Sequence, residues 1–297
     1  MAAPQRHRMT VNGVDHAYLA AGPEDGPLVV CVHGFPDTPV GFEPLLTALA
    51  DRGHRAVAPW MRGYAPTAVP ADGTSSLPAW VADLDALHER LRPDGDPAVL
   101  VGHDWGALAT YGAASVAPER WRRIVTGAVP PPMAMLSVLG TYDQVKRFWY
   151  QYLFMRPGSE DIVAANDLEF LDHLWADWSP GLDVASVVGP AKDALRERAN
   201  LTAALSTYRL MYGAQELSAD EASRLAGELA ALFTPHTQPT LYLQGADDGC
   251  VSRAAFDATP SVLPEGSEAV LLEGAGHFFQ YEVTDRFTDL VLEFLAR

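Results

Sequence analysis

Residues 102–106 carry the most informative chemistry in the sequence, because a carboxylate, Asp104, stands midway between two glycines. An apolar run over residues 98–101 precedes this segment, and small, helix-compatible residues at 107–114 follow it. A strand, a tight turn with glycine at both ends and a helix together predict a nucleophile elbow. In such an elbow the middle side chain projects from the end of a parallel strand. Serine is the usual occupant of this position, and here it is Asp104.

An aspartate at this position changes the chemistry that the elbow can perform. A hydroxyl needs an adjacent base before it attacks, whereas a carboxylate with a reference pKa of about 3.9 is already ionised at neutral pH. Attack by a carboxylate on an acyl carbon would give an unstable anhydride. Attack on an sp³ carbon gives an ester, which water can then hydrolyse. Asp104 therefore predicts displacement at carbon through a covalent alkyl-enzyme intermediate.

Hydrolysis of such an ester requires a base to activate water and an acid to orient that base. His277 lies in a glycine-rich turn after the last predicted strand, and Asp247 and Asp248 directly follow the preceding strand. An alternative position for the acid, at residues 128–130, holds no carboxylate. The sequence therefore predicts a triad of Asp104, His277 and one of these two aspartates. Their chain order of nucleophile, acid, base is that of the α/β-hydrolases.

Strands that alternate with helices must position these groups. Short apolar runs predict strands buried on both faces of a sheet, and runs with helical spacing predict amphipathic helices between them. This alternation indicates an α/β fold with a mostly parallel sheet and helices on both of its faces. The expected strands are residues 28–32, 56–59, 98–101, 123–129, 240–243 and 269–272, and the expected helices include 42–49, 79–91 and 286–296.

The alternating pattern is interrupted after the prolines at residues 130–132. From residue 131 to residue 235 the chain is helical in character, rich in aromatic residues and without a plausible buried strand. We therefore expect an α/β core formed by residues 1–130 and 236–297. The helical insertion at 131–235 is expected to form a cap over the strand ends, where α/β sheets place their sites.

Composition excludes several classes of function. The chain has 297 residues and a net charge of -17, which argues against nucleic acid and anionic membranes as partners. It has no apolar run long enough for a membrane span and no signal-peptide pattern at its start. Its two cysteines, Cys31 and Cys250, are expected to be reduced thiols in a cytoplasmic protein.

Three motifs together resemble one known family. Residues 33–36 (His-Gly-Phe-Pro), 102–106 (Gly-His-Asp-Trp-Gly) and 276–278 (Gly-His-Phe) are similar to those of the soluble epoxide hydrolases of the α/β-hydrolase fold. The resemblance implies conversion of a small-molecule epoxide to a vicinal diol, with no metal or organic cofactor. The family's spacing also favours Asp248 over Asp247 as the acid.

The resemblance further implies two tyrosines in the cap that hold the epoxide oxygen. Residues 150–158 match the family's first cap segment and select Tyr150, and residues 208–211 match the second and select Tyr208. The chemistry needs them, because ring opening makes an alkoxide, which is a poor leaving group unless a donor stabilises or protonates it.

The family also implies an oxyanion hole and a substrate pocket. The backbone N–H groups of Phe35 and Trp105 would hold the tetrahedral intermediate formed on Asp104. We expect substrate-binding side chains at Phe35, Trp105, Tyr150, Tyr208, Trp149 and Phe278. His33 and His103 are expected to tie loops together rather than to take part in the chemistry.

Two other functions remain open from the sequence. A haloalkane dehalogenase would use the same triad but would cradle a halide with N–H donors from tryptophan or asparagine, and Phe35 offers no side-chain donor where such an asparagine often stands. A ligand-binding protein of the same fold would have no need of a complete triad. The aromatic cap favours an apolar or aromatic epoxide, and the chain is expected to be a monomer or a homodimer.

Overall fold

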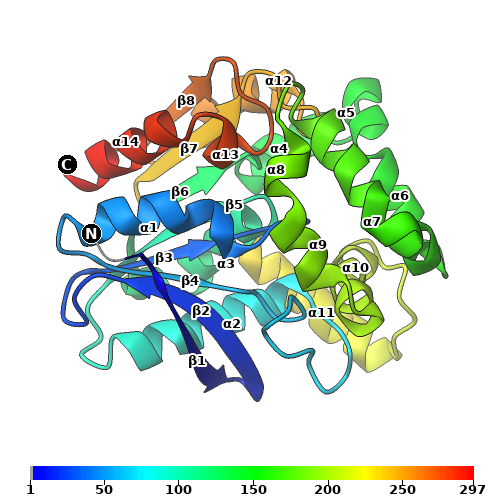
Figure 1. Cartoon of the computed structure of the whole chain (residues 1–297), viewed down its shortest axis with the longest axis horizontal. Coiled ribbons are helices and arrows are strands. Elements are labelled where there is room, and N and C mark those ends of the chain that lie inside the picture. Colours follow the sequence, from blue (N-terminus) through cyan, green and yellow to red (C-terminus); the bar gives the residue numbers. More distant parts are fainter. Residues whose placement is uncertain (1–2) are drawn as a thin grey trace.

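The computed structural model describes residues 3–297 and places one sheet of eight strands through this part of the chain (Figure 1). The strand order is β1-β2-β4-β3-β5-β6-β7-β8. The pairs β1–β2 and β2–β4 are antiparallel, and all the other neighbouring strands are parallel. The strands are β1 (Gln5–Val11), β2 (Val14–Ala21), β3 (Leu28–Val32), β4 (Arg55–Pro59), β5 (Ala98–His103), β6 (Trp121–Gly127), β7 (Thr240–Gly245) and β8 (Glu268–Leu272).

The central strands lie in the core because they are apolar along their whole length. Every residue of β3, β5 and β7 is buried, as expected for parallel strands that helices cover on both faces. Two groups of helices flank the sheet: α1 packs with α14, and α2 packs with α3 and α11. These helices are α1 (Glu43–Ala50), α2 (Leu77–Leu91), α3 (Trp105–Val116), α11 (Ala219–Leu232) and α14 (Thr284–Leu295).

The remaining helices lie mostly between β6 and β7. Figure 1 shows α5 to α10 as a group beside the sheet, on the side to which the arrows of β3 and β6 point. They therefore stand at the carboxyl ends of the strands. These and the remaining short helices are α4 (Pro132–Val138), α5 (Tyr142–Arg147), α6 (Trp149–Phe154), α7 (Ser159–Trp178), α8 (Val184–Val187), α9 (Gly189–Leu195), α10 (Arg198–Met211), α12 (Arg253–Ala258), α13 (Phe279–Glu282), η1 (Pro39–Phe42), η2 (Pro118–Arg120) and η3 (Thr259–Ser261).

The last helix of the expected cap, α11, packs on the core instead. A Cβ added to Gly112 of α3 would meet Val81 of α2 at 2.9 Å and Leu232 of α11 at 3.1 Å. This close packing against α2 and α3 makes α11 part of the layer that covers the sheet. We therefore propose that the cap ends before α11 rather than at residue 235. In the sequence, the end of the cap was set at residue 235 because no strand was expected before that point. The absence of a strand does not show whether a helix packs on the cap or on the core.

The expected strands and helices are present, and two further strands, β1 and β2, were not among the six expected. β1 pairs antiparallel with β2 at the edge of the sheet, and six of its seven residues are not buried. An edge strand of this kind has no apolar run that would mark it in the sequence. Cys31 and Cys250 are both free and buried, as expected. Among residues 3–297 we find no helix long and apolar enough to cross a membrane.

Candidate active site

The turn between β5 and α3 holds Asp104 in a backbone conformation that few residues adopt. Its φ is 55° and its ψ is -120°, so the side chain projects from the strand end at a sharp corner. Glycine is required at positions 102 and 106 because backbone atoms of neighbouring segments lie too close for a Cβ. A Cβ on Gly106 would lie 2.1 Å from the carbonyl oxygen of Val32, and one on Gly102 would lie 2.3 Å from the carbonyl oxygen of Gly106. This segment is therefore a nucleophile elbow with aspartate at its tip.

The carboxylate of Asp104 lies between the loop after β3 and the turn that holds His277. The backbone N–H of Phe35 donates a hydrogen bond of 2.8 Å to Asp104 Oδ1. Asp104 Oδ2 lies 3.6 Å from His277 Nε2. Gly34 allows this arrangement, because a Cβ there would stand 2.3 Å from Asp104 Oδ1. One carboxylate oxygen is thus held by an amide donor and the other faces an imidazole.

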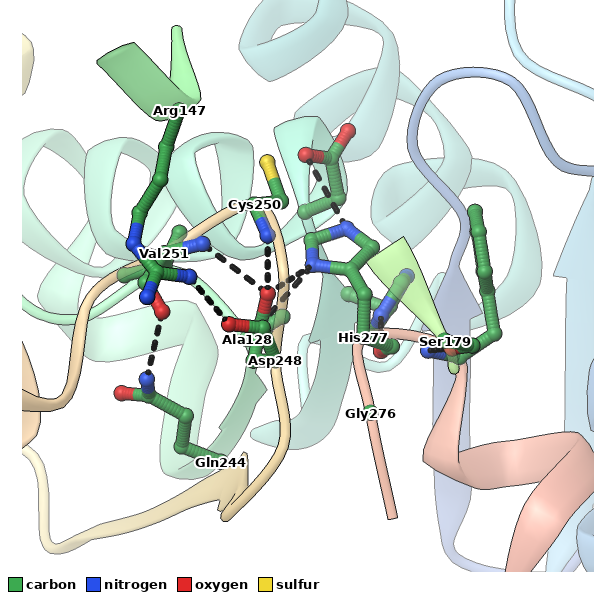
Figure 2. A network of polar contacts seen from close by, with 12 residues as sticks. Ala128, Arg147, Ser179, Gln244, Asp248, Cys250, Val251, Gly276 and His277 are labelled. Atoms are coloured by element: carbon green, nitrogen blue, oxygen red, sulfur yellow. Dashed lines mark hydrogen bonds and ion pairs between the residues drawn. The ribbon is translucent and has the colours of Figure 1, made fainter. Parts of the chain in front are cut away.

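Asp248 orients His277 from the other side of the ring. Its Oδ2 lies 3.1 Å from His277 Nδ1, and its Oδ1 accepts hydrogen bonds from the backbone N–H groups of Cys250 at 2.7 Å and Val251 at 2.9 Å. Figure 2 shows His277 and these donors converging on the Asp248 carboxylate. The neighbouring Asp247 is exposed. Of the two aspartates left open by the sequence, Asp248 is the one in contact with the histidine.

The two carboxylates set the charge of His277. Burial by itself disfavours the imidazolium, but Asp248 and Asp104 together outweigh it and raise the pKa of His277 to about 10. At the two other histidines of the site the effect of burial prevails. It lowers the pKa of His33 to about 4 and the pKa of His103 to about 3, so both are neutral at neutral pH.

These two neutral histidines hold loops of the site together. His33 Nε2 accepts a hydrogen bond of 3.0 Å from the backbone N–H of Met61. His103 Nε2 donates one of 2.8 Å to the carbonyl oxygen of His277. The backbone N–H of His277 donates to the carbonyl oxygen of Trp178, at 2.9 Å. The catalytic turn is therefore fixed both by β5 and by the end of α7.

Helix α5 secures the loop that carries Asp248. Arg147 donates a hydrogen bond of 2.6 Å to the carbonyl oxygen of Asp248, as Figure 2 shows. The buried amide of Gln144 donates to the carbonyl oxygen of Cys250 at 3.0 Å and accepts from the backbone N–H of Ser252 at 2.9 Å. Sequence reasoning missed both residues, because no motif marks them and the contacts span about a hundred positions of chain.

A cavity of about 240 Å³ opens beside the elbow. The side chains with polar groups in its lining are those of Asp104, Trp105, Tyr150, Gln151, Tyr212 and Cys250. The rest of its wall is apolar and comes from α4, α10 and the residues around them, including Met135, Leu136, Leu139, Phe148, Met211 and Phe233. A second recess of about 250 Å³ shares several of these residues, so apolar walls continue from the carboxylate toward α5 and α6.

The two tyrosines selected by the sequence lie close together, and Tyr208 lies beside Trp105. Their ring centroids are 6.0 Å apart, and the ring of Tyr208 lies 5.0 Å from that of Trp105. Tyr150 lines the cavity, and its hydroxyl contacts Gln151 and Cys250. The buried hydroxyl of Tyr208 has no hydrogen-bond partner among the described residues. Burial raises the pKa of both phenols well above the usual value, so both carry a proton to donate.

Four of the expected substrate-binding side chains do not line the cavity, those of Phe35, Trp149, Tyr208 and Phe278. The ring of Phe35 is buried against Phe154 and Tyr208, and Phe278 stacks on Trp175 with centroids 3.7 Å apart. Trp149 is 46% exposed and borders a different recess on the surface. An aromatic cap residue can pack, line a pocket or face solvent, and its side-chain direction depends on the tertiary packing around it. Two other residues that line the cavity were not expected to do so: Gln151, which belongs to the matched cap segment 150–158, and Cys250.

The comparisons with known proteins agree with this geometry. Residues 27–283 match the family model described as the alpha/beta hydrolase fold. The AB hydrolase superfamily protein YfhM of Bacillus subtilis is 28% identical over 290 residues, which cover 97% of this chain and 96% of that protein. Epoxide hydrolase A of Mycobacterium tuberculosis is 27% identical, with 100% of this chain and 98% of that protein covered. A solved epoxide hydrolase from an endophytic Streptomyces superposes with a TM-score of 0.78 at 26% identity, over 100% of this chain and 96% of the other.

Proposed function

The chain belongs to the α/β-hydrolase fold family, and from its site we propose that it is an epoxide hydrolase that acts through a covalent ester on Asp104. The observation that carries the proposal is the pairing of this carboxylate with two buried phenols: Tyr150, which lines the same cavity, and Tyr208, whose ring lies 6.0 Å from that of Tyr150. A carboxylate attacks an sp³ carbon, and phenols donate to the oxygen that leaves that carbon. The similarity to named epoxide hydrolases supports the same activity.

The first half reaction opens the ring. One oxygen of Asp104 forms a bond to an epoxide carbon while the bond from that carbon to the epoxide oxygen breaks. The phenols of Tyr150 and Tyr208 donate to the oxygen as its charge develops. Asp104 Oδ2 is the oxygen free to attack, because Oδ1 already accepts from the backbone N–H of Phe35. The product of this step is a hydroxyalkyl ester on Asp104.

The second half reaction hydrolyses the ester. Once Asp104 is esterified, its negative charge is gone and only Asp248 still favours the imidazolium form of His277. The pKa of His277 therefore falls, and Nε2 becomes available as a base for water. The oxyanion that then forms at Oδ1 is stabilised by the N–H of Phe35. We propose the N–H of Trp105 as its second donor, which follows from the position of Trp105 directly after Asp104.

The cavity wall indicates the class of epoxide. Among the described residues that line the cavity and the adjoining recess, Asp104 is the only charged side chain. An ionised substrate would lose its hydration there and gain no partner of opposite charge. The apolar walls instead gain free energy by covering an apolar chain or ring. We therefore propose an uncharged epoxide with an apolar or aromatic substituent as the substrate.

The dehalogenase alternative is less well supported by the same cavity. A departing halide requires N–H donors, and Trp105 is the only tryptophan among the described cavity-lining residues, which include no asparagine. Trp175 uses its Nε1–H to bond the carbonyl oxygen of Pro36 at 3.0 Å. The two phenols, in contrast, suit an oxygen that becomes an alkoxide. These positions favour an epoxide as the electrophile.

The decisive experiment is the intact mass of a His277→Gln variant after exposure to an aryl epoxide and, separately, to a haloalkane. This variant should form the ester but should not release it. A mass gain equal to the whole epoxide, mapped to the peptide that contains Asp104 and absent from Asp104→Ala/His277→Gln, is the expected result. A gain from the haloalkane alone, short by the halide, would establish the dehalogenase instead. Binding of epoxides without any adduct would indicate a ligand-binding protein.

A further inference from the structure

The end of helix α7 lies against both loops that carry the acid and the base. The carbonyl oxygen of Trp178 accepts a hydrogen bond from the backbone N–H of His277 at 2.9 Å and a second from that of Gly249 at 3.0 Å. Gly249 directly follows Asp248 in the chain. One carbonyl group of α7 therefore holds the turn of the base and the loop of the acid at the same time.

Glycine at two positions allows α7 to come this close. A Cβ added to Gly276 would lie 2.5 Å from the Cα of Ser179, and one added to Gly249 would overlap the carbonyl oxygen of Asp177. A larger residue at either position would have to displace the end of the helix. The end of α7 is therefore packed backbone against backbone on both loops.

Ser179 and Glu282 hold the two N–H groups that flank the one of His277. The N–H of Phe278 donates to Ser179 Oγ at 2.8 Å. The N–H of Gly276 donates to both carboxylate oxygens of Glu282, at 3.0 Å each. Ser179 Oγ in turn donates to Glu282 Oε2 at 2.9 Å, and Figure 2 shows Ser179 beside the turn. The backbone N–H groups of three consecutive residues, 276–278, are thus all paired.

The hydroxyl of Ser179 links these contacts. Its side chain is buried, and its oxygen accepts one hydrogen bond while its proton is donated in another. Without this hydroxyl, the N–H of Phe278 would be left without a partner and Glu282 would lose one donor. Ser179 and Glu282 should therefore depend on each other in holding the turn.

Glu282 also places a carboxylate behind the turn. Partial burial raises the pKa of Glu282, while hydrogen bonds from Gly276 and Ser179 and the charge of His277 oppose the rise. The attraction is mutual, so a charged Glu282 favours the imidazolium form of His277. The other titratable groups whose charges act on His277 are those of Asp104, Asp248 and His103.

The position of the turn matters for one half reaction only. Nε2 of His277 must reach a water molecule that in turn reaches the ester carbon, and a misplacement of about 1 Å in such an arrangement can cost about 10²-fold in rate. Attack by the carboxylate of Asp104 needs no base. Hydrogen bonds that fix residues 276–278 should therefore act on ester hydrolysis.

We propose that Ser179 and Glu282 form a positioning pair for His277, which fixes the base against the end of α7 and supports ester hydrolysis but not ester formation. Both residues act through the backbone of the turn and take no part in the bond changes. This inference rests on the ester intermediate of the proposed function. It adds to that function two residues that no sequence motif marked.

The test measures both half reactions in a single turnover. An aryl epoxide is mixed with excess enzyme, and rapid-quench intact mass follows the appearance and the decay of the ester. The variants are Ser179→Ala, Glu282→Ala, Glu282→Gln and the double variant Ser179→Ala/Glu282→Ala. The dependence of ester formation on enzyme concentration gives the dissociation constant, so that binding and chemistry are separated.

A matched control is available at the opposite edge of the sheet. Ser267 Oγ accepts a hydrogen bond of 2.9 Å from the backbone N–H of Thr240, at the amino end of β7. Ser267→Ala therefore removes the same kind of contact as Ser179→Ala, far from the strand ends that carry the site. It should lower the melting temperature and leave both half reactions unchanged.

Ser179→Ala should slow ester hydrolysis about 10-fold, as expected for loss of one buried hydrogen bond, with little change in ester formation or in the dissociation constant. Glu282→Ala should slow hydrolysis about 10- to 100-fold, because it removes the partner of two donors. The double variant should lose less than the product of the two single losses, because the residues act as one pair.

Glu282→Gln separates hydrogen bonding from charge and serves as a second readout if Glu282→Ala folds poorly. Its amide oxygen can still accept from the N–H of Gly276, so hydrolysis should be faster than in Glu282→Ala. Loss of the charge lowers the pKa of His277, so hydrolysis should level off at a lower pH than in the wild type. An unchanged pH profile together with an unchanged rate of hydrolysis would contradict the proposal.

Three further results would overturn the positioning pair. These are equal slowing of both half reactions, single losses that multiply fully in the double variant, and the same selective slowing of hydrolysis in Ser267→Ala. Absence of any epoxide ester on the wild type and on His277→Gln would refute the proposed function instead.

Discussion

His277 Nε2 lies 3.6 Å from Asp104 Oδ2, beyond hydrogen-bonding distance, while His277 Nδ1 lies 3.1 Å from Asp248 Oδ2. The histidine is therefore fixed by the acid and stands beside the nucleophile without bonding to it. This suits a carboxylate nucleophile, which needs no base for its own attack. It leaves Nε2 facing the atoms where the ester will form, which is where a base is required.

Asp248→Asn should separate the two half reactions. Ester formation should change only a few-fold, because attack by a carboxylate needs no base. Ester hydrolysis should slow by up to about 10⁴-fold, the loss found when the orienting acid of a serine-histidine-aspartate triad becomes an amide. Rapid-quench mass spectrometry measures both steps. Asp247→Asn, at the exposed neighbouring position, is the matched control and should leave both rates unchanged.

The half reactions should also differ in their dependence on pH. With both carboxylates charged, the pKa of His277 is raised to about 10, and it falls once Asp104 is esterified. Ester hydrolysis should therefore increase with pH and level off well below about pH 10, while ester formation stays flat from about pH 6 to about pH 9. Single-turnover rates across this range test the point. A hydrolysis rate that rises steadily through pH 10 would contradict it.

The same shift predicts how His277 affects stability. Its pKa is higher in the folded than in the unfolded protein, where it is about 6.5, so the folded state binds the proton more tightly. The stabilisation is fully present below about pH 6.5 and is lost as the pH rises toward about 10. Urea unfolding of the wild type and His277→Gln should show the difference in unfolding free energy shrinking between pH 7 and pH 10. A constant difference would show that His277 gains no proton on folding.

The strained backbone of Asp104 predicts that two variants that are equally inactive will differ in stability. Asp104→Gly and Asp104→Ala should both abolish ester formation, since both lack the carboxylate. Glycine tolerates a φ of 55° and a ψ of -120°, whereas alanine does not, so the glycine variant should be the more stable by about 1–3 kcal/mol. Thermal unfolding of the pair isolates the backbone effect, because both variants lose the same side-chain contacts. Equal melting temperatures of the two variants would mean that the backbone at residue 104 is not strained.

Gln144 should support catalysis from a distance through the loop that carries Asp248. Gln144→Met leaves the carbonyl oxygen of Cys250 and the N–H of Ser252 without their buried partner, which should cost about 1–3 kcal/mol of stability. Ester hydrolysis should slow more than ester formation, because only hydrolysis depends on the position of Asp248. Gln144→Glu keeps an acceptor for Ser252 and should lie between the wild type and Gln144→Met. The reverse order of the two variants would argue against a clamp on this loop.

The sequence alone predicted the elbow, the chain order of the proposed catalytic groups and the α/β alternation. The glycines around Asp104 and the fully apolar strands are local patterns, and each has one physical solution: close backbone approach for the glycines and burial on both faces for the strands. The same patterns placed His277 and the two candidate acids at neighbouring strand ends. These conclusions required no knowledge of how distant segments meet.

Other features were decided only by the tertiary structure. The sequence left Asp247 and Asp248 as candidates, and the spacing typical of the family favoured Asp248. Only the folded chain shows that the carboxylate of Asp248 contacts His277. The positions of Trp149 and Phe278 outside the cavity, the packing of α11 on the core, and the contact between Gln151 and Tyr150 depend on side-chain direction and on which helices touch. Sequence periodicity gives the buried face of an element, but the partner that covers this face is set by the packing of the whole chain.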